Sequence, residues 1–526
     1  MIKQSPDSIN FEMNEQMSVF NYANKMKEKQ KQQILEKLLN YNINTLNKGF
    51  QNFKLNAPKT IPFKKLVDCQ NLDIRDDIIG FKTIAEGKLA IVISSQQNTG
   101  FLDIQLPSKK CLFQLYFERI QSLQNLTKNI QGNCIPILIF IMTTNFNHDI
   151  ITSNLQNSNY YGLEEHQIYF FQQDCLPLLS IDGQILFRNE NQIYEEHIGN
   201  GQIYLNKQIL ETMKLLGITI LQLCSIENIL CKFGDPFWLG AFTRLQLDLS
   251  FKCTQKRNSE EKLLIVVEND QSQLRLIENN EISIKQVSNS YGLIGQVLCS
   301  LDYALDLCKN YKSQMQTNLP MRQKKCTYFD YKLNQLIQPK LATSNALKFE
   351  ITYYDSLPYC SIHKFGLFNV QRDDEYAPII NNLNDTKDTA QTARNAYLQR
   401  DLKWITQLGI NINLEIEISP KLTYFGEGLH EILQTINIQK ANKKNQLILD
   451  QDSKQVKMLR VYSDHNQVQK NNYSKNLNIQ LANFEKEFQQ SLFQLPLELK
   501  KQTQRINLVQ KQETLRDANY TENYQN

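Results

Sequence analysis

Apolar positions along the 526-residue chain change their spacing from one region to the next. From about residue 15 to 55 apolar side chains recur at helical spacing between charged faces, which predicts helices. From about 85 to 380 short apolar runs alternate with longer amphipathic segments, and from about 405 to 465 short apolar runs are separated by turn residues. Beyond about residue 466 the chain is polar and rich in Asn and Gln, with one amphipathic stretch that Pro496 interrupts.

The central region has the pattern of an α/β fold. Strands are expected at residues 89–93, 135–142, 167–171, 219–224, 263–267 and 349–353, and helices at 112–127, 207–216 and 300–315. This order implies βαβ units, and therefore a mixed, mostly parallel sheet with helices on both faces. We expect a helical region over 1–80, an α/β domain over 81–400, a small β-rich domain over 401–465, and a flexible or partly helical tail over 466–526.

Composition excludes several classes of function. The 58 basic and 54 acidic residues nearly cancel, so the charge gives no argument for nucleic-acid binding. No apolar run approaches the ~18 residues of a membrane span. The sequence starts MIKQSPDSINFEMNEQ, which is unlike a secretory or mitochondrial signal, so we expect a cytoplasmic protein. Its 11 cysteines form no CxxC pair and its 6 histidines stand apart, which argues against a zinc site.

The turn after the first expected strand bears on nucleotide binding. In α/β nucleotide-binding proteins this turn is usually rich in glycine, because glycine lets backbone N–H groups close on a phosphate. Here the strand LAIVI is followed by SSQQNTG, with the single glycine Gly100 at its far end. A chain patterned like a nucleotide-binding protein therefore has little phosphate loop.

Six segments resemble, in order, motifs of the eukaryotic UDP-N-acetylglucosamine (UDP-N-acetylhexosamine) pyrophosphorylase family. They are LPSKKCLFQLYFERI (106–120), YYGLEEHQIYFFQQDCLP (160–177), GNG (199–201), SIENILCKFGDP (225–236), QRDDEYAPIIN (371–381) and EISPKLTYFGEGL (417–429). The resemblance implies a Rossmann-like nucleotidyltransferase core with an N-terminal helical part and a small C-terminal β domain. It also implies the family reaction, in which UTP and N-acetylglucosamine 1-phosphate give UDP-N-acetylglucosamine and pyrophosphate with Mg²⁺.

Family positions for the base, the sugar and the metal are partly kept. The resemblance places Gln173 at uracil, the loop Gly199, Asn200 and Gly201 on base and sugar, Glu278 and Glu281 near the sugar, and Asn345 in a kept binding segment. It places Glu227, where the family has aspartate, and Asp355 near a metal. Each of these segments could instead have a structural role without a ligand. FFQQ could be a strand end, GNG a turn, and the two glutamates exposed acids of a loop.

Family positions for the phosphates are largely lost. The glycine-rich loop of pattern LAGGxGTRLGxxxPKG is replaced by the short turn, and Thr99 and Ile380 stand where the family has lysines. Ser290 and Leu293 replace two family asparagines. Lys109 and Lys110, beside the strand exit, are the nearby basic candidates for a substitute, although an ordinary contact of the LPSxK segment is the alternative for both.

These losses favour one hypothesis over two others. The favoured one is a catalytically weak or inactive relative that still binds a UDP-sugar or UTP, or has a structural role through protein partners at its N-terminal helices or its 466–526 tail. The second is an active uridylyltransferase with a remodelled phosphate loop, which would use Mg²⁺. The third is an unrelated binding module.

Overall fold

The computed structural model describes residues 16–41, 43–53, 60–62, 66–68, 73, 75–95, 98–258, 260–269, 273–277, 290–312, 320–339, 343–381, 385–410, 415–435, 447–452 and 455–460. All of them belong to one unit, Met1–Val461. The predicted tail lies outside the described residues, as do Glu278 and Glu281. No helix within the described ranges is long and apolar enough to cross a bilayer.

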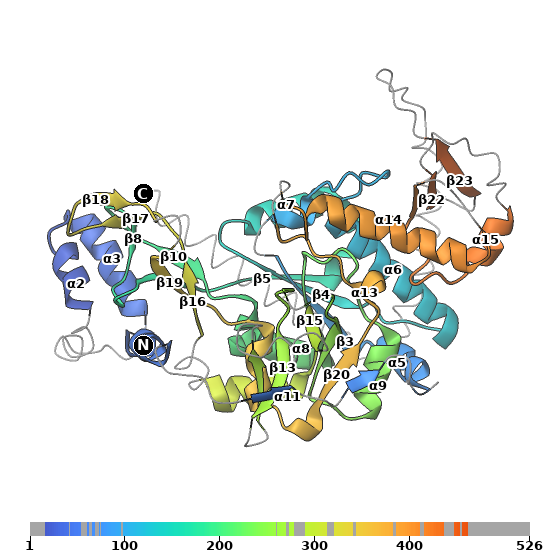
Figure 1. Ribbon diagram of the computed structural model, residues 1–526, viewed down its shortest axis with the longest axis horizontal. Helices are drawn as coiled ribbons and strands as arrows, with labels where there is room; N and C mark the ends of the chain where they lie inside the picture. The colour runs from blue at the N-terminus through green and yellow to red at the C-terminus, as the bar shows by residue number, and fades with distance from the viewer. Residues whose placement is uncertain are drawn as a thin grey trace. The chain divides into compact units, whose positions relative to one another are not determined.

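An eight-stranded sheet forms the centre of this unit (Figure 1). Its strands, in spatial order, are β2 (Leu66–Asp68), β20 (Phe365–Asn369), β12 (Leu249–Gln255), β15 (Tyr291–Ser300), β11 (Ile220–Ser225), β3 (Leu89–Ser94), β4 (Leu138–Thr143) and β5 (Ile168–Gln172). Strand β15 pairs antiparallel with both β11 and β12, whereas all other neighbours pair in parallel. The predicted mixed, mostly parallel sheet is confirmed.

Both faces of the sheet are buried, which explains why β3 is apolar throughout. Along β3, Leu89, Ile91 and Ile93 join one core cluster, while Ala90 and Val92 join the other. Residues of α5 (Asp76–Ala85), α6 (Leu112–Gln131), α7 (His148–Asn157), α9 (Pro236–Arg244) and α14 (Ala390–Gln407) complete the first cluster. The second is completed by residues of α8 (Lys207–Leu215), α11 (Leu301–Asp306), η6 (Asn200–Leu205), η9 (Tyr353–Tyr359) and the N-terminal helices.

The N-terminal helices are α2 (Met17–Ala23), α3 (Glu28–Asn40) and α4 (Ile43–Phe53), as the helical spacing predicted. They pack beside small antiparallel strands, where Gln16 donates from Nε2 to the Gly183 carbonyl at 2.8 Å. These strands are β6 (Cys175–Pro177), β7 (Leu179–Ser180), β8 (Phe187–Asn189), β9 (Gln192–Ile193), β10 (Glu195–His197), β16 (Met321–Lys324), β17 (Tyr328–Asp330), β18 (Gln335–Ile337) and β19 (Ala346–Phe349).

The C-terminal part contains β21 (Ile416–Ile418), β22 (Leu447–Asp452) and β23 (Gln455–Arg460), which form a three-stranded sheet beside α15 (Leu429–Thr435). Helix α14 runs through residue 400 and supplies Ile405 to the small core under this sheet. A further three-stranded sheet joins β1 (Thr60–Pro62), β13 (Ile265–Asn269) and β14 (Leu274–Ile277).

Two sequence expectations differ from the structure. The strand predicted at 349–353 is wrong: β19 ends at Phe349, and Thr352 instead begins η9, where its side chain and the Asp355 side chain form a capping box. Strands β12, β15 and β20 of the central sheet were not predicted.

Candidate functional site

The candidate site lies at the edge where the parallel strands end. Strands β11, β3, β4 and β5 end at Ser225, Ser94, Thr143 and Gln172, and the loops that follow them meet at this edge. The exit loops of β3 and β4 are tied together, because Asn147 donates from Nδ2 to the Ser95 carbonyl at 2.9 Å. This is the edge at which open α/β sheets bind their ligands.

A cavity of about 300 Å³ opens at this edge. It is lined by residues that follow β3 and β11, by β15, and by the segment after α13 (Arg372–Glu375): Thr99, Ser225, Glu227, Asn228, Cys231, Ile294, Gly295, Gln296, Tyr376, Pro378, Ile379 and Ile380. No lysine, arginine or histidine is among these lining residues. Thr99 and Ile380, the two residues that the resemblance aligns with family lysines, thus line the same cavity as Glu227.

Glu227 is the one carboxylate in this lining. Burial raises its pKa to about 7, although its own backbone N–H lowers it in part. Its side chain forms no ion pair with a described residue. A cavity with this lining favours neutral or polar groups and gives a polyphosphate no counter-charge.

The second predicted metal ligand, Asp355, has a different position. It accepts hydrogen bonds from the Thr352 backbone N–H at 2.6 Å and from Thr352 Oγ1 at 2.8 Å, and it is not among the residues that line the cavity. Burial raises its pKa. Across the described residues no group of three or more His, Cys, Asp or Glu side chains is placed to hold a metal ion. For Mg²⁺ the cavity offers one carboxylate, and the other oxygen ligands would come from neutral side chains, water or a substrate.

Gln173 follows β5 at the other end of the same edge, three strands from β11, or about 14 Å at the usual strand spacing. Its backbone N–H donates to the Thr143 carbonyl at 2.9 Å, which fixes its position. The side chain is 4% exposed, and neither its Oε1 nor its Nε2 has a hydrogen-bond partner among the described residues. An unpaired buried amide costs about 1–3 kcal/mol, so this group is suited to a partner that a ligand supplies.

His197 lies beside Gln173. Its Nδ1 is 3.2 Å from Cys175 Sγ, whereas its buried Nε2 has no partner among the described residues. Burial lowers the pKa of His197 below 6.5, so the ring is neutral at pH 7. The lowered pKa favours the uncharged ring next to the Gln173 amide, although charged side chains such as Glu196 and Lys348 lie close to His197.

The loop Gly199–Asn200–Gly201 is held tightly against the segment 351–353. Asn200 accepts a hydrogen bond through Oδ1 from the Tyr353 backbone N–H at 2.9 Å. A Cβ at Gly199, whose φ is +100°, would lie 2.3 Å from the Ile351 carbonyl oxygen, and one at Gly201 would lie 2.3 Å from the Thr352 carbonyl oxygen. Both glycines are thus required for close packing, whatever the loop binds.

Neither basic candidate lines the cavity that Glu227 faces. Lys110 is buried and donates from Nζ to Glu118 at 2.8 Å and to Ser419 Oγ at 3.0 Å, which ties α6 to the C-terminal part. Lys109 is exposed, in a turn where its φ is +58°. Asn345 also has structural contacts, because its amide pairs with both the N–H and the carbonyl of Cys326.

The described end of the turn after β3 packs on α6. It contains η3 (Asn98–Phe101), in which a Cβ at Gly100 would lie 2.2 Å from the Phe113 ring. Phe101 packs on Phe113 with ring centroids 5.0 Å apart and does not line the cavity. The apolar side chain has therefore turned towards the core, and the space beside Thr99 is open.

Most of the lining was not singled out from the sequence, including the polar residues Ser225, Asn228, Gln296 and Tyr376. Gln296 lines the cavity and is 1% exposed. Its Nε2 has no hydrogen-bond partner among the described residues, so this donor is available to a ligand. The available signal was the largely apolar run YGLIGQVLCS, which forms β15 and includes Gln296.

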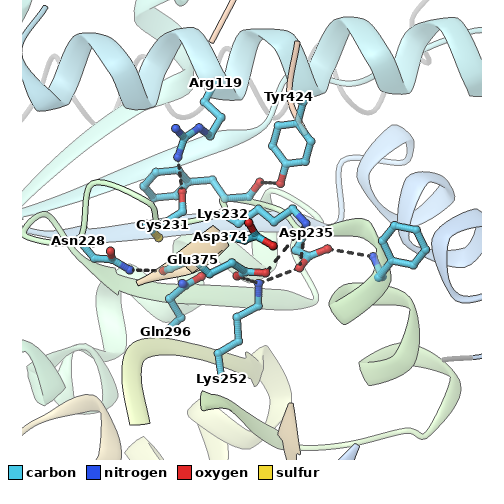
Figure 2. A network of polar contacts seen from close by, with 12 residues as sticks. Arg119, Asn228, Cys231, Lys232, Asp235, Lys252, Gln296, Asp374, Glu375 and Tyr424 are labelled. Carbon is cyan, nitrogen blue, oxygen red and sulfur yellow. Dashed lines mark hydrogen bonds and ion pairs between the residues drawn. The ribbon is translucent and has the colours of Figure 1, made fainter. Parts of the chain in front are cut away.

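Buried charges support the wall of the cavity (Figure 2). Lys252 is fully buried on β12 and donates from Nζ to Asp235 at 2.7 Å and to Glu375. Asn228 donates from Nδ2 to the Glu375 carbonyl at 2.8 Å and accepts from the Ala377 N–H at 2.9 Å. These bonds hold the segments 228–232 and 374–380 together and so fix the side chains that line the cavity.

Comparison with known proteins gives concordant matches. Residues 22–399 match the family described as UTP–glucose-1-phosphate uridylyltransferase. UDP-N-acetylglucosamine pyrophosphorylase of Saccharomyces cerevisiae is 28% identical over 377 residues, which cover 67% of this chain and 77% of that protein. UDP-N-acetylglucosamine diphosphorylase 1 of Arabidopsis thaliana is 29% identical over 388 residues, covering 67% and 74%. The crystal structure of uridine diphosphate N-acetylglucosamine pyrophosphorylase from Trypanosoma brucei has the same fold, with a TM-score of 0.71, 20% identity, and coverage of 86% and 100%.

Proposed function

Since the chain belongs to the UTP–glucose-1-phosphate uridylyltransferase family, as a divergent relative of the UDP-N-acetylglucosamine pyrophosphorylases, we propose that it is a catalytically weak or inactive member that has kept a site for a uridine nucleotide or nucleotide sugar. The observation that carries the proposal is the cavity at the carboxyl edge of the sheet, whose lining contains Glu227 but no cation.

Transfer of a nucleotidyl group makes strong electrostatic demands. The phosphates must be held in line, and the negative charge that develops on the leaving pyrophosphate must be stabilised by donors and cations already in place. Removing one such group typically raises the barrier by ~3–4 kcal/mol. With the loop donors and both lysines lost, we expect a barrier higher by roughly 5 kcal/mol or more, and a rate thousands-fold lower, even with strong non-additivity.

Gln173, at the other end of the carboxyl edge of the sheet, supports retained binding of a uridine nucleotide. Gln173 is buried with both amide atoms unpaired, at the position where the resemblance implies a contact to uracil. The Watson–Crick edge of uracil carries one donor and flanking acceptors, and the amide of glutamine can pair with such an edge through its own donor and acceptor. Burial lowers the pKa of His197 beside it, which favours the uncharged ring next to a base.

The alternative of an active enzyme with a remodelled loop finds less support. Lys110 would have to leave Glu118 and Ser419, and its removal would leave Glu118, which is 1% exposed, without its closest cation. Mg²⁺ dependence stays a proposal tied to activity, with Glu227 as the candidate ligand. A structural role through the N-terminal helices or the tail also stays a proposal.

Turnover is the first measurement. Pyrophosphate release from UTP and N-acetylglucosamine 1-phosphate with Mg²⁺ should not exceed a no-enzyme blank, or should exceed it only weakly. Turnover of about 1 per second or more, within the usual range of enzymes, would contradict the proposal and favour the active alternative.

Binding is tested with Gln173→Leu, which keeps the size of the side chain but removes its donor and acceptor. Because the free chain leaves this amide unpaired, the free energy of unfolding should not fall, whereas affinity for UDP-N-acetylglucosamine should fall about tenfold by calorimetry. Gln172→Leu, at the exposed neighbouring position, is the matched control and should bind as the wild type does. Absence of nucleotide binding in the wild type would leave the structural role as the function to pursue.

A further inference from the structure

A second cavity, of about 170 Å³, lies on the other side of the segment 228–232. Its wall brings together three cations and three aromatic rings, Arg119, Lys232, Arg400, Trp404, Tyr424 and Phe425, with the carboxylates Asp374 and Glu375 and with Leu230. None of the residues that the sequence predicted for the nucleotide site lines it. Figure 2 shows Arg119 and Tyr424 approaching from one side of the buried Lys252–Asp235–Glu375 cluster, with Lys232 between them and the cluster.

Arg119 is a buried cation without a carboxylate. It comes from α6, is 4% exposed, and donates from Nη1 to the backbone carbonyls of Cys231 at 2.7 Å and Ile229 at 3.4 Å. Its guanidinium forms no ion pair with any described carboxylate. Burying a charge without an opposite charge is costly, so this position favours an anion that the cavity can admit.

The charges around the cavity do not balance. Lys232 reaches Asp235 only at 3.8 Å and Glu375 only at 4.0 Å, and both carboxylates pair more closely with Lys252. The charged residues of the wall and their ion-pair partners comprise five cations, Arg119, Lys232, Lys252, Arg400 and Lys403, against four anions, Asp235, Asp374, Glu375 and Asp401. The excess is positive, and among the four cations that have an ion-pair partner Lys232 has the longest pairing distances.

The rings give the cavity flat walls. The guanidinium of Arg400 lies 4.5 Å from the Trp404 ring centroid and 4.2 Å from that of Tyr397. Phe425, which is 36% exposed, lies 5.9 Å from Lys232 Nζ. An apolar cavity of about 150 Å³ takes up benzene, so this volume suits one ring with a small substituent.

We propose that this second cavity is a binding site for a small anion that carries one planar ring, with its carboxylate or phosphate between Arg119 and Lys232 and its ring against Trp404, Tyr424 and Phe425. The site is separate from the nucleotide site and does not depend on the proposed function. Arg119 and Lys232 supply the charge-assisted hydrogen bonds, and the rings supply stacking area.

Two ring probes of matched size and one small anion without a ring test the proposal on the full chain. Benzoate, benzamidine and inorganic phosphate differ in charge sign and in the presence of a ring. Benzoate should bind saturably by calorimetry and quench the fluorescence of Trp404, whereas benzamidine, with the same ring and the opposite charge, should bind at least about tenfold more weakly. Equal binding of benzoate and benzamidine, equal binding of benzoate and phosphate, or no saturable binding of benzoate would each overturn the proposal.

Variants locate the probe. Lys232→Met should weaken benzoate about fivefold, since Lys232 is partly exposed and its pairing is screened. Trp404→Phe should abolish the fluorescence change while calorimetric binding persists, because Trp238, the other tryptophan, is 1% exposed and does not line the cavity. Lys421→Met, at an exposed lysine of the same C-terminal segment that does not line the cavity, is the matched control. Unchanged affinity in Lys232→Met, or loss in Lys421→Met alone, would overturn the assignment.

Discussion

At the scale of single residues, side chains that are distant in the sequence decide the charge of the nucleotide site. Thr99 follows β3, Glu227 follows β11 and Ile380 follows α13, yet all three line one cavity. The two neutral residues stand where the resemblance implies lysines, so neither position gives the cavity a positive charge. Ile380 is 68% exposed, which makes it the position where charge can be returned at least cost to the fold.

Ile380→Lys should therefore raise affinity for UTP. A lysine at this mouth adds one opposite charge to the triphosphate, and a partly exposed pair of this kind gives about a twofold to fivefold gain. Calorimetric titration with UTP measures it, and added salt should reduce the gain. Ile380→Gln, of similar size and no charge, controls for polarity, and Leu333→Lys, exposed outside the cavity, controls for net charge. Equal gains in all three variants would refute a local effect.

At the scale of elements, the conformation of the loop Gly199–Asn200–Gly201 depends on a close approach between two short helices, η6 and η9. Gly199 precedes η6 and packs on the segment that starts η9, where Tyr353 donates to Asn200. The glycines of this loop are explained by packing alone, so their presence does not by itself indicate a ligand.

Gly199→Ala should be destabilising for two reasons, a positive φ and a Cβ placed 2.3 Å from the Ile351 carbonyl oxygen. Gly217→Ala has the positive φ, +83°, but no steric clash, because nothing lies within 4 Å of a Cβ there. We expect a loss in the free energy of unfolding of about 1 kcal/mol for Gly217→Ala and about 2–4 kcal/mol for Gly199→Ala. Urea unfolding measures both, and equal losses would mean that the loop relaxes away from Ile351.

At the scale of the whole unit, the buried cluster of Lys252, Asp235 and Glu375 connects the central sheet to α9 and α13. Asp235 is also the N-cap of α9, accepting from the Phe237 N–H at 3.2 Å. Burial alone would raise the pKa of Asp235, but Lys232 and Lys252 lower it from 3.8 to about 2. This cluster therefore makes stability depend on acid.

The sign follows from proton binding. The unfolded chain protonates Asp235 near pH 3.8, whereas the folded chain does so only near pH 2, so the stabilisation is complete above about pH 4 and is lost as the pH falls towards 2. Its size is about 2 kcal/mol. Between pH 5 and 3 the free energy of unfolding should fall more steeply for the wild type than for Asp235→Asn, which keeps an N-cap side chain. Parallel slopes would contradict a lowered pKa.

How much of this unit the sequence could predict depended on how far each strand is apolar. Strands β3, β4 and β5 are apolar except at their last residue, β11 is interrupted in its middle only by the uncharged Gln222, and all four were predicted within a few residues. Strand β12 was missed because Lys252 stands in the middle of LSFKCTQ, and a lysine is buried there only because Asp235 and Glu375, distant in sequence, neutralise it. Strand β15 was missed because Gly292 and Gly295 interrupt it.

The candidate site was predictable to a similar degree. The resemblance led to Gln173 and Glu227, and the structure places them at the same edge of the sheet. Asn345 and Lys110 have structural contacts that no local pattern reveals, whereas Asp355 belongs to a local capping box with Thr352. Gln296 depends on the register of an unpredicted strand. The second cavity combines α6, α14 and the C-terminal segment, which no motif spacing could bring together.

The two cavities share one wall. Cys231 lines the first with its side chain while its carbonyl holds Arg119 in the second, and Glu375 lines the second while the next residue, Tyr376, lines the first. The wall is thus a single layer of chain. The effects of substitutions on its opposite sides on the free energy of unfolding should therefore not be additive. A double-mutant cycle between Gln296 and Lys232 would measure this coupling across the layer.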